Sequence, residues 1–365
     1  MSTLFLPVSG FLGAGKTTTL IAAAKLLEAR GRRVAIVTND QGADLVDTRL
    51  ARSDASVVGE VTGGCFCCRF EDLLDVTRTL VDGEGVDTVL AEAVGSCTDL
   101  QATVVRPLRA YYGDRFTAPV LTTVVEPDRL TALSASLPMR DTGSDLSYLF
   151  AKQLEEADVI AVNKTDLLDR AETTAVLAAL RASHPSATVL ACSAMTGHGM
   201  AELVRHWTGG GAYPARDLDV DYTRYASAEA GLAWLNRTLT LSAPDGFDPA
   251  AWADAVLRAL SESAHRRGWL VGHVKIALDS AAGLTKLSLT AAGAAPVAAT
   301  SPVAAVAEAA VTVNARVACD PEELDDSVDA AVREAAERIS AVVRDSGAAA
   351  AFKPGYPRPT HRLPA

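Results

Sequence analysis

The sequence has few of the features that mark secreted, membrane or nucleic-acid-binding proteins. None of its apolar runs reaches the roughly 18 residues that a membrane-spanning helix needs, and the opening stretch MSTLFLPVSG has neither a basic start nor a small-residue cleavage site. Aromatic residues make up only 5% of the chain, and no stripe of lysine and arginine offsets the net charge of −11. We therefore expect a cytoplasmic protein that binds neither membranes nor nucleic acid.

Cysteine and histidine are scarce, and the cysteines are unevenly placed. Three of the six cysteines lie within four positions of one another, whereas the six histidines form no histidine-rich tract. In a long cytoplasmic chain, such a cysteine cluster is more typical of metal ligands or redox groups than of a disulfide framework.

The first two hundred residues alternate short apolar runs with longer amphipathic stretches. This pattern predicts an α/β domain over residues 1–207, built on a mostly parallel sheet with helices on both faces. Strands are expected at residues 4–9, 33–38, 56–61, 87–92, 119–125, 159–163 and 188–192. Helices are expected at residues 16–30, 70–81, 100–111, 146–156, 170–182 and 200–206.

A second, smaller domain is expected after a linker. Residues 208–225 form the predicted linker, because glycine and proline punctuate the stretch TGGGAYPARD. A changed rhythm then predicts an α+β domain over residues 226–344, with strands at 233–241, 272–278, 284–289 and 310–319 and helices at 249–267 and 322–344. The proline-punctuated residues 345–365 are predicted to be disordered.

The strongest motif lies between the first expected strand and the first expected helix. It matches the pattern G-x-x-x-x-G-K-[ST], in which glycines let backbone N–H groups turn toward a phosphate and the lysine reaches the β and γ phosphates. Thr17, which follows the lysine, is the expected Mg²⁺ ligand. The residues expected to bind the phosphates are Gly10, Gly13, Ala14, Gly15, Lys16, Thr17 and Thr18.

A second motif, Asn163-Lys164-Thr165-Asp166, indicates which base is bound. The Asp166 carboxylate can accept hydrogen bonds from N1–H and N2–H₂ of guanine, which adenine lacks, while the Lys164 stem lies along the base. Ser193 and Ala194 follow the next strand and are expected to close over the base edge with backbone N–H groups. Downstream of a phosphate loop, this combination favours GTP over ATP.

Two acidic residues join Lys16 as candidates for catalysis. Asp47 lies in the stretch NDQGADLVDTRL, where a switch loop would follow the second strand, and we expect it to hold Mg²⁺ or its ligand shell. Glu92 ends a central strand and is expected beside the γ-phosphate, where it would position the attacking water. The predicted catalytic set is therefore Lys16, Asp47 and Glu92.

The clustered cysteines are Cys65, Cys67 and Cys68, and the Gly63-Gly64 pair before them lets the backbone bend so that the sulfurs converge. Thiolates favour Zn²⁺, Co²⁺, Cu⁺ or an Fe–S cluster over hard cations. A closed structural zinc site needs four ligands, so the fourth position is open, or it is filled by a distant residue such as Cys97 or by a partner. Two other interpretations stay open here: a dithiol redox switch and three small buried hydrophobes.

The chain resembles the CobW/HypB/UreG family of P-loop GTPases, in its CobW-like branch, through GFLGAGKTTTL, NDQGADLVDTRL, GGCFCC, the strand ending in Glu92, NKTD and SAMTG, in that order. The resemblance implies a P-loop GTPase domain and a ferredoxin-like C-terminal domain. It also implies a protein that uses GTP and Mg²⁺ and delivers Zn²⁺, Co²⁺ or Ni²⁺ to a client protein. The family's C-x-C-C motif carries over to Cys65, Cys67 and Cys68, its phosphate-loop lysine to Lys16 and its switch acid to Asp47.

The chain departs from the family pattern in two places. Glu92-Ala93-Val94-Gly95 stands where E-[ST]-[ST]-G is usual, which removes hydroxyl groups from the expected switch contacts, and a histidine-rich metal-holding segment is missing. Two alternative functions therefore stay open: a GTPase chaperone of a corrinoid- or metal-dependent enzyme that carries no metal itself, and a non-catalytic zinc-sensing module. The sequence names neither the client nor the oligomer, and a nucleotide-dependent homodimer also stays open.

Overall fold

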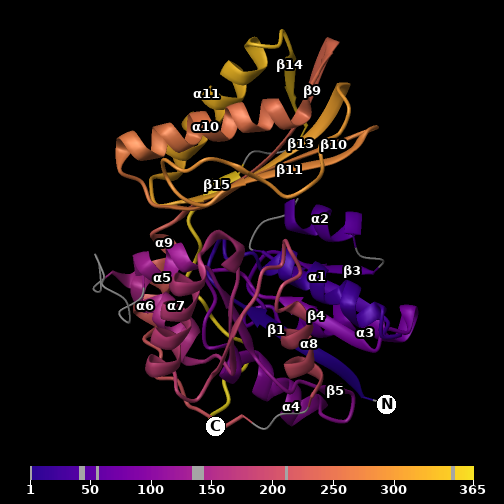
Figure 1. The fold of residues 1–365 in the computed structure, drawn as a ribbon, viewed down its shortest axis with the longest axis vertical. Coiled ribbons are helices and arrows are strands. Elements are labelled where there is room, and N and C mark those ends of the chain that lie inside the picture. Colours follow the sequence, from indigo (N-terminus) through magenta and orange to yellow (C-terminus); the bar gives the residue numbers. More distant parts are fainter. Residues whose placement is uncertain (1, 41–45, 55–56, 134–143, 210–212, 347–349) are drawn as a thin grey trace. The chain divides into compact units, whose positions relative to one another are not determined.

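The computed structural model describes residues 2–40, 46–54, 57–133, 144–209, 213–346 and 350–365. The chain divides into two compact units (Figure 1). The N-terminal unit comprises Met1–Gln41, Asp54–Ala228 and Tyr356–Ala365, and the C-terminal unit comprises Gly42–Ser53 and Glu229–Gly355. The main boundary lies after residue 228, close to residue 226 where the second domain was expected to begin, so the expected linker 208–225 belongs to the N-terminal unit. Each unit also includes a short segment from elsewhere in the chain.

A parallel sheet forms the centre of the N-terminal unit. Its strands lie in the order β3-β2-β4-β1-β6-β7-β8, and β5 pairs with β1. They are β1 (Thr3–Ser9), β2 (Val34–Asn39), β3 (Val58–Val61), β4 (Thr88–Glu92), β5 (Phe116–Thr117), β6 (Thr122–Val125), β7 (Val159–Val162) and β8 (Thr188–Ala191). Every residue of β1, β4 and β7 is buried, because a parallel sheet is covered on both faces and its strands are apolar throughout.

Helices accompany these strands: α1 (Lys16–Glu28), α3 (Phe70–Glu84), η1 (Gln101–Val105), α4 (Arg106–Tyr112), α5 (Pro127–Leu133), α6 (Asp145–Glu155), η2 (Thr165–Leu167), α7 (Arg170–Ser183), α8 (Met200–Thr208) and α9 (Tyr222–Ala230). The region expected as one helix over residues 100–111 begins with the π-helix η1, since Pro107 lacks a backbone N–H and its ring crowds the preceding turn. No helix in the described ranges is long and apolar enough to cross a membrane.

The strand order positions the expected nucleotide motifs at one edge of the sheet. β1 lies between β4 and β6, and Val8 pairs with Glu92 on one side and with Thr122 on the other. In open α/β sheets, ligands bind outside the carboxyl ends of the strands where the order reverses. The glycine loop follows β1, Glu92 ends β4 and Asn163 follows β7, so all three lie at this edge.

The C-terminal unit contains an antiparallel sheet with the order β12-β11-β10-β13-β9-β14, and β15 pairs with β9. Its elements are β9 (Ala233–Phe247), α10 (Pro249–Arg267), β10 (Val271–Ser280), β11 (Gly283–Leu289), β12 (Val297–Ala298), β13 (Val306–Val317), α11 (Pro321–Glu337), β14 (Val342–Asp345) and β15 (Ala350–Phe352). The strands β9, β10, β13 and β14 with α10 and α11 give the β-α-β-β-α-β arrangement of a ferredoxin-like domain. The expected fold class is confirmed in both units.

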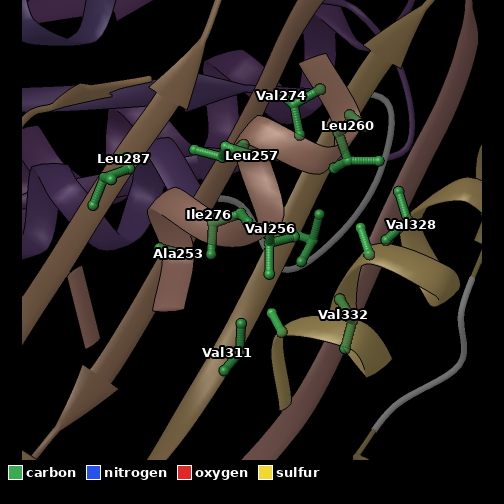
Figure 2. Packing of buried hydrophobic residues seen from close by; sticks show 14 of the residues in the cluster. Ala253, Val256, Leu257, Leu260, Val274, Ile276, Leu287, Val311, Val328 and Val332 are labelled. Carbon is green, nitrogen blue, oxygen red and sulfur yellow. The ribbon is translucent and has the colours of Figure 1, made fainter. Parts of the chain in front are cut away.

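The core of the C-terminal unit lies between its two long helices and one face of its sheet (Figure 2). Val256, Leu257 and Leu260 of α10 belong to one buried cluster with Ile276 of β10 and Val332 of α11. The Asp248 side chain caps α10 by accepting from the N–H groups at its first turn. The helix has a capping residue and an apolar face, and the strands alternate apolar and polar residues. These two patterns explain why the elements of this unit could be predicted from the sequence.

The opposite face of this sheet is polar and holds the helix α2 (Val46–Asp54). Because strand side chains alternate between faces, Lys275, Lys286 and Asn314 point away from the apolar cluster. The backbone N–H of Val46 donates to Asn314 Oδ1 at 2.8 Å, and Asp47 forms ion pairs with both lysines. The helix that follows the expected switch loop thus belongs to the C-terminal unit up to residue 53.

The second half of the chain differs in detail from what the sequence predicts. The helix expected over 322–344 ends at Glu337, because Ser340 adopts a left-handed φ of 53° that a helix cannot follow, and Val342–Asp345 forms β14. The described part of the linker packs on the N-terminal unit, where Arg216 donates to Asp158 at 2.9 Å. The tail expected to be disordered supplies β15, and its last ten residues, 356–365, bind the N-terminal unit.

Candidate functional site

The glycine loop between β1 and α1 has the shape of an anion cradle. Gly10, Gly13 and Gly15 have φ angles of 137°, 85° and 90°, in a region that L side chains rarely adopt. A Cβ atom on Gly10 would lie 2.1 Å from the carbonyl oxygen of Val124. The loop runs directly into the N-terminus of α1, whose first-turn N–H groups and dipole favour a phosphate.

Lys16 and Glu92 lie close together at this loop. The Lys16 ammonium group donates to the carbonyl oxygen of Gly10 at 2.9 Å and lies 4.0 Å from Glu92 Oε1. Lys16, Glu92 and Thr17 are all buried, with exposures of 7%, 6% and 4%, whereas Thr18 is partly exposed. Two of the three residues expected to be catalytic are therefore adjacent, in surroundings where charge interactions are strong.

Asn163 joins three loops of the expected nucleotide site. Its Nδ2 donates to the carbonyl oxygen of Ala14 at 2.9 Å, and its Oδ1 accepts from the backbone N–H of Ala194 at 2.9 Å. A Cβ atom on Gly15 would lie 2.5 Å from the same Nδ2. This side chain therefore sets the spacing between the phosphate loop and the loop of Ser193 and Ala194.

Lys164 and Asp166 take different positions after β7. Lys164 has a left-handed φ of 60° and forms a close ion pair with the buried Glu126. Asp166 is exposed and lines a pocket of about 290 Å³ together with Thr165 and Ser193. An exposed carboxylate beside a pocket is free to accept hydrogen bonds from a ligand, whereas the ion pair of Lys164 fixes its stem. Glu126 is a residue that the sequence motifs did not indicate.

Asp47 is engaged within the C-terminal unit. Its Oδ1 lies 3.2 Å from Lys286 Nζ, and its Oδ2 forms a closer ion pair with Lys275. Burial alone would raise the pKa of Asp47, but Lys275 and Lys286 outweigh it and hold the pKa well below its usual range. A role of Asp47 toward Mg²⁺ therefore requires these two ion pairs to break.

The cysteine loop follows β3 and is held by Asn39, the last residue of β2. Asn39 Nδ2 donates to the carbonyl oxygens of Val61 and Gly64 at 3.0 and 2.8 Å, and its Oδ1 accepts from the backbone N–H of Phe66 at 2.9 Å. Gly63 and Gly64, with φ angles of 77° and 157°, make the bend that precedes the thiols. Sequence reasoning missed Asn39, although it opens the stretch NDQGADLVDTRL.

The three sulfurs of Cys65, Cys67 and Cys68 lie within 4.8 Å of one another. Cys67 and Cys68 are 3.9 Å apart, close to the separation of about 3.8 Å that two thiolates have on one tetrahedral zinc ion. Cys65 and Cys67 are 2.8 Å apart, so they must separate by about 1 Å to share a metal ion. The donor set of soft, convergent sulfurs fits a zinc, cobalt or copper ion.

A fourth thiol lies beside the cluster. Cys97 is fully buried, and its side chain is in hydrogen-bond contact with that of Cys67. Gln153 Nε2 fixes the loop of Cys97 by donating to the carbonyl oxygens of Gly95 and Cys97 at 3.0 and 2.8 Å. Hydrogen bonds to Cys65 and then to Cys68 and Cys97 raise the pKa of Cys67, so the Cys67 thiol keeps its proton at neutral pH when no metal is bound.

The last residues of the chain also touch the cysteine loop. The backbone N–H of Arg358 donates to the Sγ atom of Cys68 at 3.1 Å, and the backbone N–H of Thr360 donates to the carbonyl oxygen of Cys67 at 2.8 Å. Nothing in the composition of this proline-punctuated tail indicates a binding partner, so the contact could not be found from the sequence.

The glycine loop runs from a central parallel strand into a helix, and the buried Lys16 faces Glu92 at the end of the neighbouring strand. These features define a P-loop nucleotide-binding domain. The chain belongs to the CobW/HypB/UreG family, since residues 5–191 match its nucleotide-binding domain. The family expected from the sequence motifs is thus confirmed.

Several curated proteins are similar to this chain. The zinc chaperone CobW of Pseudomonas aeruginosa is 31% identical over 210 residues, which cover 49% of this chain and 53% of that protein. The probable GTPase Mb1533 of Mycobacterium bovis is 29% identical over 269 residues, which cover 64% of this chain and 71% of that protein. The zinc chaperone YjiA of Escherichia coli is 40% identical over 76 residues, 20% of this chain and 23% of that protein. The chain thus spans about half the length of the CobW protein.

Proposed function

We propose that the protein is a GTPase that binds a transition metal ion, zinc first with cobalt or nickel as alternatives, and transfers it to a client protein. The observation that carries this proposal is that the phosphate loop and the clustered thiols belong to one compact unit. The names of the relatives, which include zinc chaperones and a GTPase, agree with it. Metal-binding thiols suit the reducing cytoplasm, which is the location that we propose.

In this proposal the phosphates of GTP lie in the glycine loop. Lys16 neutralises charge on the β and γ phosphates, and Glu92 positions the attacking water. Both side chains are buried, so the Lys16 charge acts at low dielectric and stabilises the anionic transition state more strongly than it would in water, while Glu92 acts through the water that it positions. Thr17 would hold Mg²⁺, which neutralises phosphate charge when it is bound. Asp166 and the backbone N–H of Ala194 would select guanine.

The proposed route from nucleotide to metal is short. Glu92 ends β4, and the loop that follows carries Cys97, whose thiol contacts Cys67. A shift of Glu92 during hydrolysis would therefore move this loop against the thiol cluster. A change of about a hundredfold in metal affinity between the GTP and GDP states corresponds to about 2.7 kcal/mol, within the usual range for coupled sites.

Titration with zinc tests this function. We expect the full chain to bind zinc with affinities that differ by about a hundredfold between its GDP form and its form with a non-hydrolysable GTP analogue. Linkage requires bound zinc to change the ratio of GTP to GDP affinity by the same factor. Lys16→Ala is the control, which should lose the nucleotide dependence and retain zinc binding.

Equal zinc affinities in the two nucleotide states would reduce the thiols to a structural site and overturn the proposal. GTP turnover by a protein that binds no metal would instead favour a chaperone that carries no metal itself. Zinc binding without any GTP turnover would favour the sensor module.

A further inference from the structure

The C-terminal segment 356–365, which we call the strap, lies along the cysteine loop in the N-terminal unit. Two hydrogen bonds bring the strap to the metal-binding loop, from the Arg358 N–H to Cys68 Sγ at 3.1 Å and from the Thr360 N–H to the Cys67 carbonyl oxygen at 2.8 Å. The Thr360 hydroxyl adds a longer contact of 3.4 Å to the carbonyl oxygen of Cys68. The strap therefore follows the backbone that carries two of the three clustered thiols.

The strap is anchored beyond this contact by a buried charge. Arg362 Nε donates to Asp99 Oδ2 at 2.7 Å, and the Asp99 side chain is only 1% exposed. Arg106 Nη1 donates to the Leu363 carbonyl oxygen at 2.8 Å, and the Leu363 N–H donates to the carbonyl oxygen of Ala102 at 2.9 Å. These bonds tie the end of the chain to the loop and helix that follow Cys97.

Between Thr360, which contacts the cysteine loop, and Arg362, which forms the anchor, His361 makes aromatic contacts. The His361 ring lies edge-on to Phe70, with ring centroids 5.0 Å apart and an angle of 88°, and 5.3 Å from the Tyr111 ring. Its Nε2 is 3.6 Å from Glu71 Oε1. Phe70 begins the helix that follows the cysteines, so the strap packs on both the loop and the helix of the thiol cluster.

The prolines of the strap restrict the backbone around Arg358, whose N–H donates to a sulfur atom. Arg358 stands between Pro357 and Pro359, which fix their own φ angles and favour an extended backbone at the residue between them. A stiff segment loses little conformational entropy when it binds. Cys65 and Cys67 are 3% and 1% exposed while Cys68 is only half-buried, so Cys68 is the thiol through which the cluster meets the surface.

We propose that the strap is part of the metal site: the backbone N–H of Arg358 positions the Cys68 thiolate as a hydrogen-bond donor, and the strap covers the metal until it lifts. This inference rests on the proposed function. An N–H donor bonds more strongly to a thiolate than to a thiol, because the bond is then charge-assisted. Metal binding, which creates the thiolate, therefore tightens the strap, and release of the strap weakens the hold of Cys68 on the metal.

The N–H group can be removed without removing the strap. Arg358→Pro deletes the donor in a backbone that is already flanked by prolines, and Arg358→Ala is the matched control, because it removes the exposed side chain and keeps the N–H. In cobalt-loaded full-length protein, we expect Arg358→Pro to move the sulfur-to-cobalt charge-transfer band to lower energy, since the thiolate loses its hydrogen bond. We expect its zinc affinity to fall about tenfold, while Arg358→Ala matches the wild type in both.

The rate at which a chelator removes zinc tests whether the strap covers the metal. Arg362→Ala breaks the anchor at Asp99 and should accelerate zinc release at least about tenfold, and Arg362→Lys, which retains the charge, should restore part of the slow rate. Circular dichroism and GTP binding verify that each variant is folded. If the proline and alanine variants at position 358 behave alike, or if Arg362→Ala releases zinc at the wild-type rate, the strap has no role at the metal. A protein that binds no metal at all would overturn the proposed function as well.

Discussion

At the scale of single residues, Cys97 decides whether the thiol cluster holds three or four sulfurs. It does not lie within 4.8 Å of every other sulfur in the cluster, but its side chain contacts Cys67 from a loop that Gln153 fixes. A tetrahedral zinc site takes four ligands, and Cys97 is the thiol beside the cluster that could supply the fourth. We therefore expect Cys97 to ligate the metal.

Replacing Cys97 with serine tests this expectation. In the cobalt-loaded protein, Cys97→Ser should weaken the sulfur-to-cobalt charge-transfer band, because one of four thiolates is lost, and it should lower zinc affinity. Cys319→Ser is the matched control, since Cys319 is half-buried in the C-terminal unit. Identical cobalt spectra for the two variants would restrict the ligands to Cys65, Cys67 and Cys68.

The residues that the sequence predicts best are those with a fixed spacing in a recognisable motif. Lys16 and Glu92 were expected together and are 4.0 Å apart. Asn39 was missed, because its three hydrogen bonds to the cysteine loop depend on how two neighbouring strands align, which a linear pattern does not specify. Arg358 was missed for the same reason, since its acceptor Cys68 lies 290 positions away.

At the scale of elements, the long strands and helices could be predicted from the sequence. Short elements, and segments that belong to one unit but come from a distant part of the chain, could not. The buried strands of the parallel sheet read as continuous apolar runs, and α10 has both an Asp248 cap and a glycine at its end. The helix α2 was not predicted, because its contacts run from Val46 to Asn314 and from Asp47 to Lys275, 268 and 228 positions further along the chain. Tertiary contacts of this kind override local propensity.

The position of α2 gives a test of the ion pairs at Asp47. Asp47→Asn removes the anion that faces Lys275 and Lys286, and Lys286 is only 5% exposed. We expect the free energy of unfolding of the C-terminal unit to fall by about 2 kcal/mol at pH 7, because a lysine is left with a weaker partner in a site of low exposure. Denaturation by urea, followed by the fluorescence of the tryptophans, measures this loss.

The matched control for Asp47 is another ion pair formed by the same helix. Arg49 lies 3.9 Å from Asp279, whose side chain is 61% exposed, and exposed pairs of this kind contribute about 0–1 kcal/mol. Arg49→Ala should therefore leave the urea midpoint nearly unchanged. Since the pKa of Asp47 is depressed, its contribution is present above the unfolded-state pKa and is lost as the pH falls through the folded-state pKa. A stability loss equal to that of Arg49→Ala would show that the lysines do not hold α2.

At the scale of the whole molecule, one buried carboxyl group links stability to pH. Glu156 is 1% exposed, and its pKa is raised from 4.5 to about 8, chiefly by burial and also by the charge of Asp99, while the N–H of Gln101 opposes the shift. Between these two values the folded protein keeps a proton that the unfolded chain has released. The free energy of unfolding therefore falls as the pH rises from about 4.5 to about 8, by on the order of 1 kcal/mol per pH unit.

Glu156→Gln separates this effect from all others, because glutamine is neutral at every pH and retains the shape of the protonated acid. We expect the variant to lose stability much less steeply than the wild type between pH 5 and pH 8 in guanidinium denaturation of the full chain. Glu155→Gln is the matched control, since the Glu155 side chain is 44% exposed and pairs with Lys152 on the surface. Equal slopes for wild type and Glu156→Gln would show that the carboxyl group is ionised in the folded state.

The pH dependence of metal binding has the opposite sign, and the same variant distinguishes the two. Hydrogen bonding with Cys65 raises the pKa of Cys68 to about 11 in the metal-free protein, so each thiol must lose a proton when it binds a metal and zinc affinity rises with pH. Raising the pH thus strengthens the metal site while Glu156 weakens the unit that contains it. In Glu156→Gln only the first effect remains, so zinc should stabilise the variant more strongly at pH 8 than at pH 6, without the loss of stability seen in the wild type.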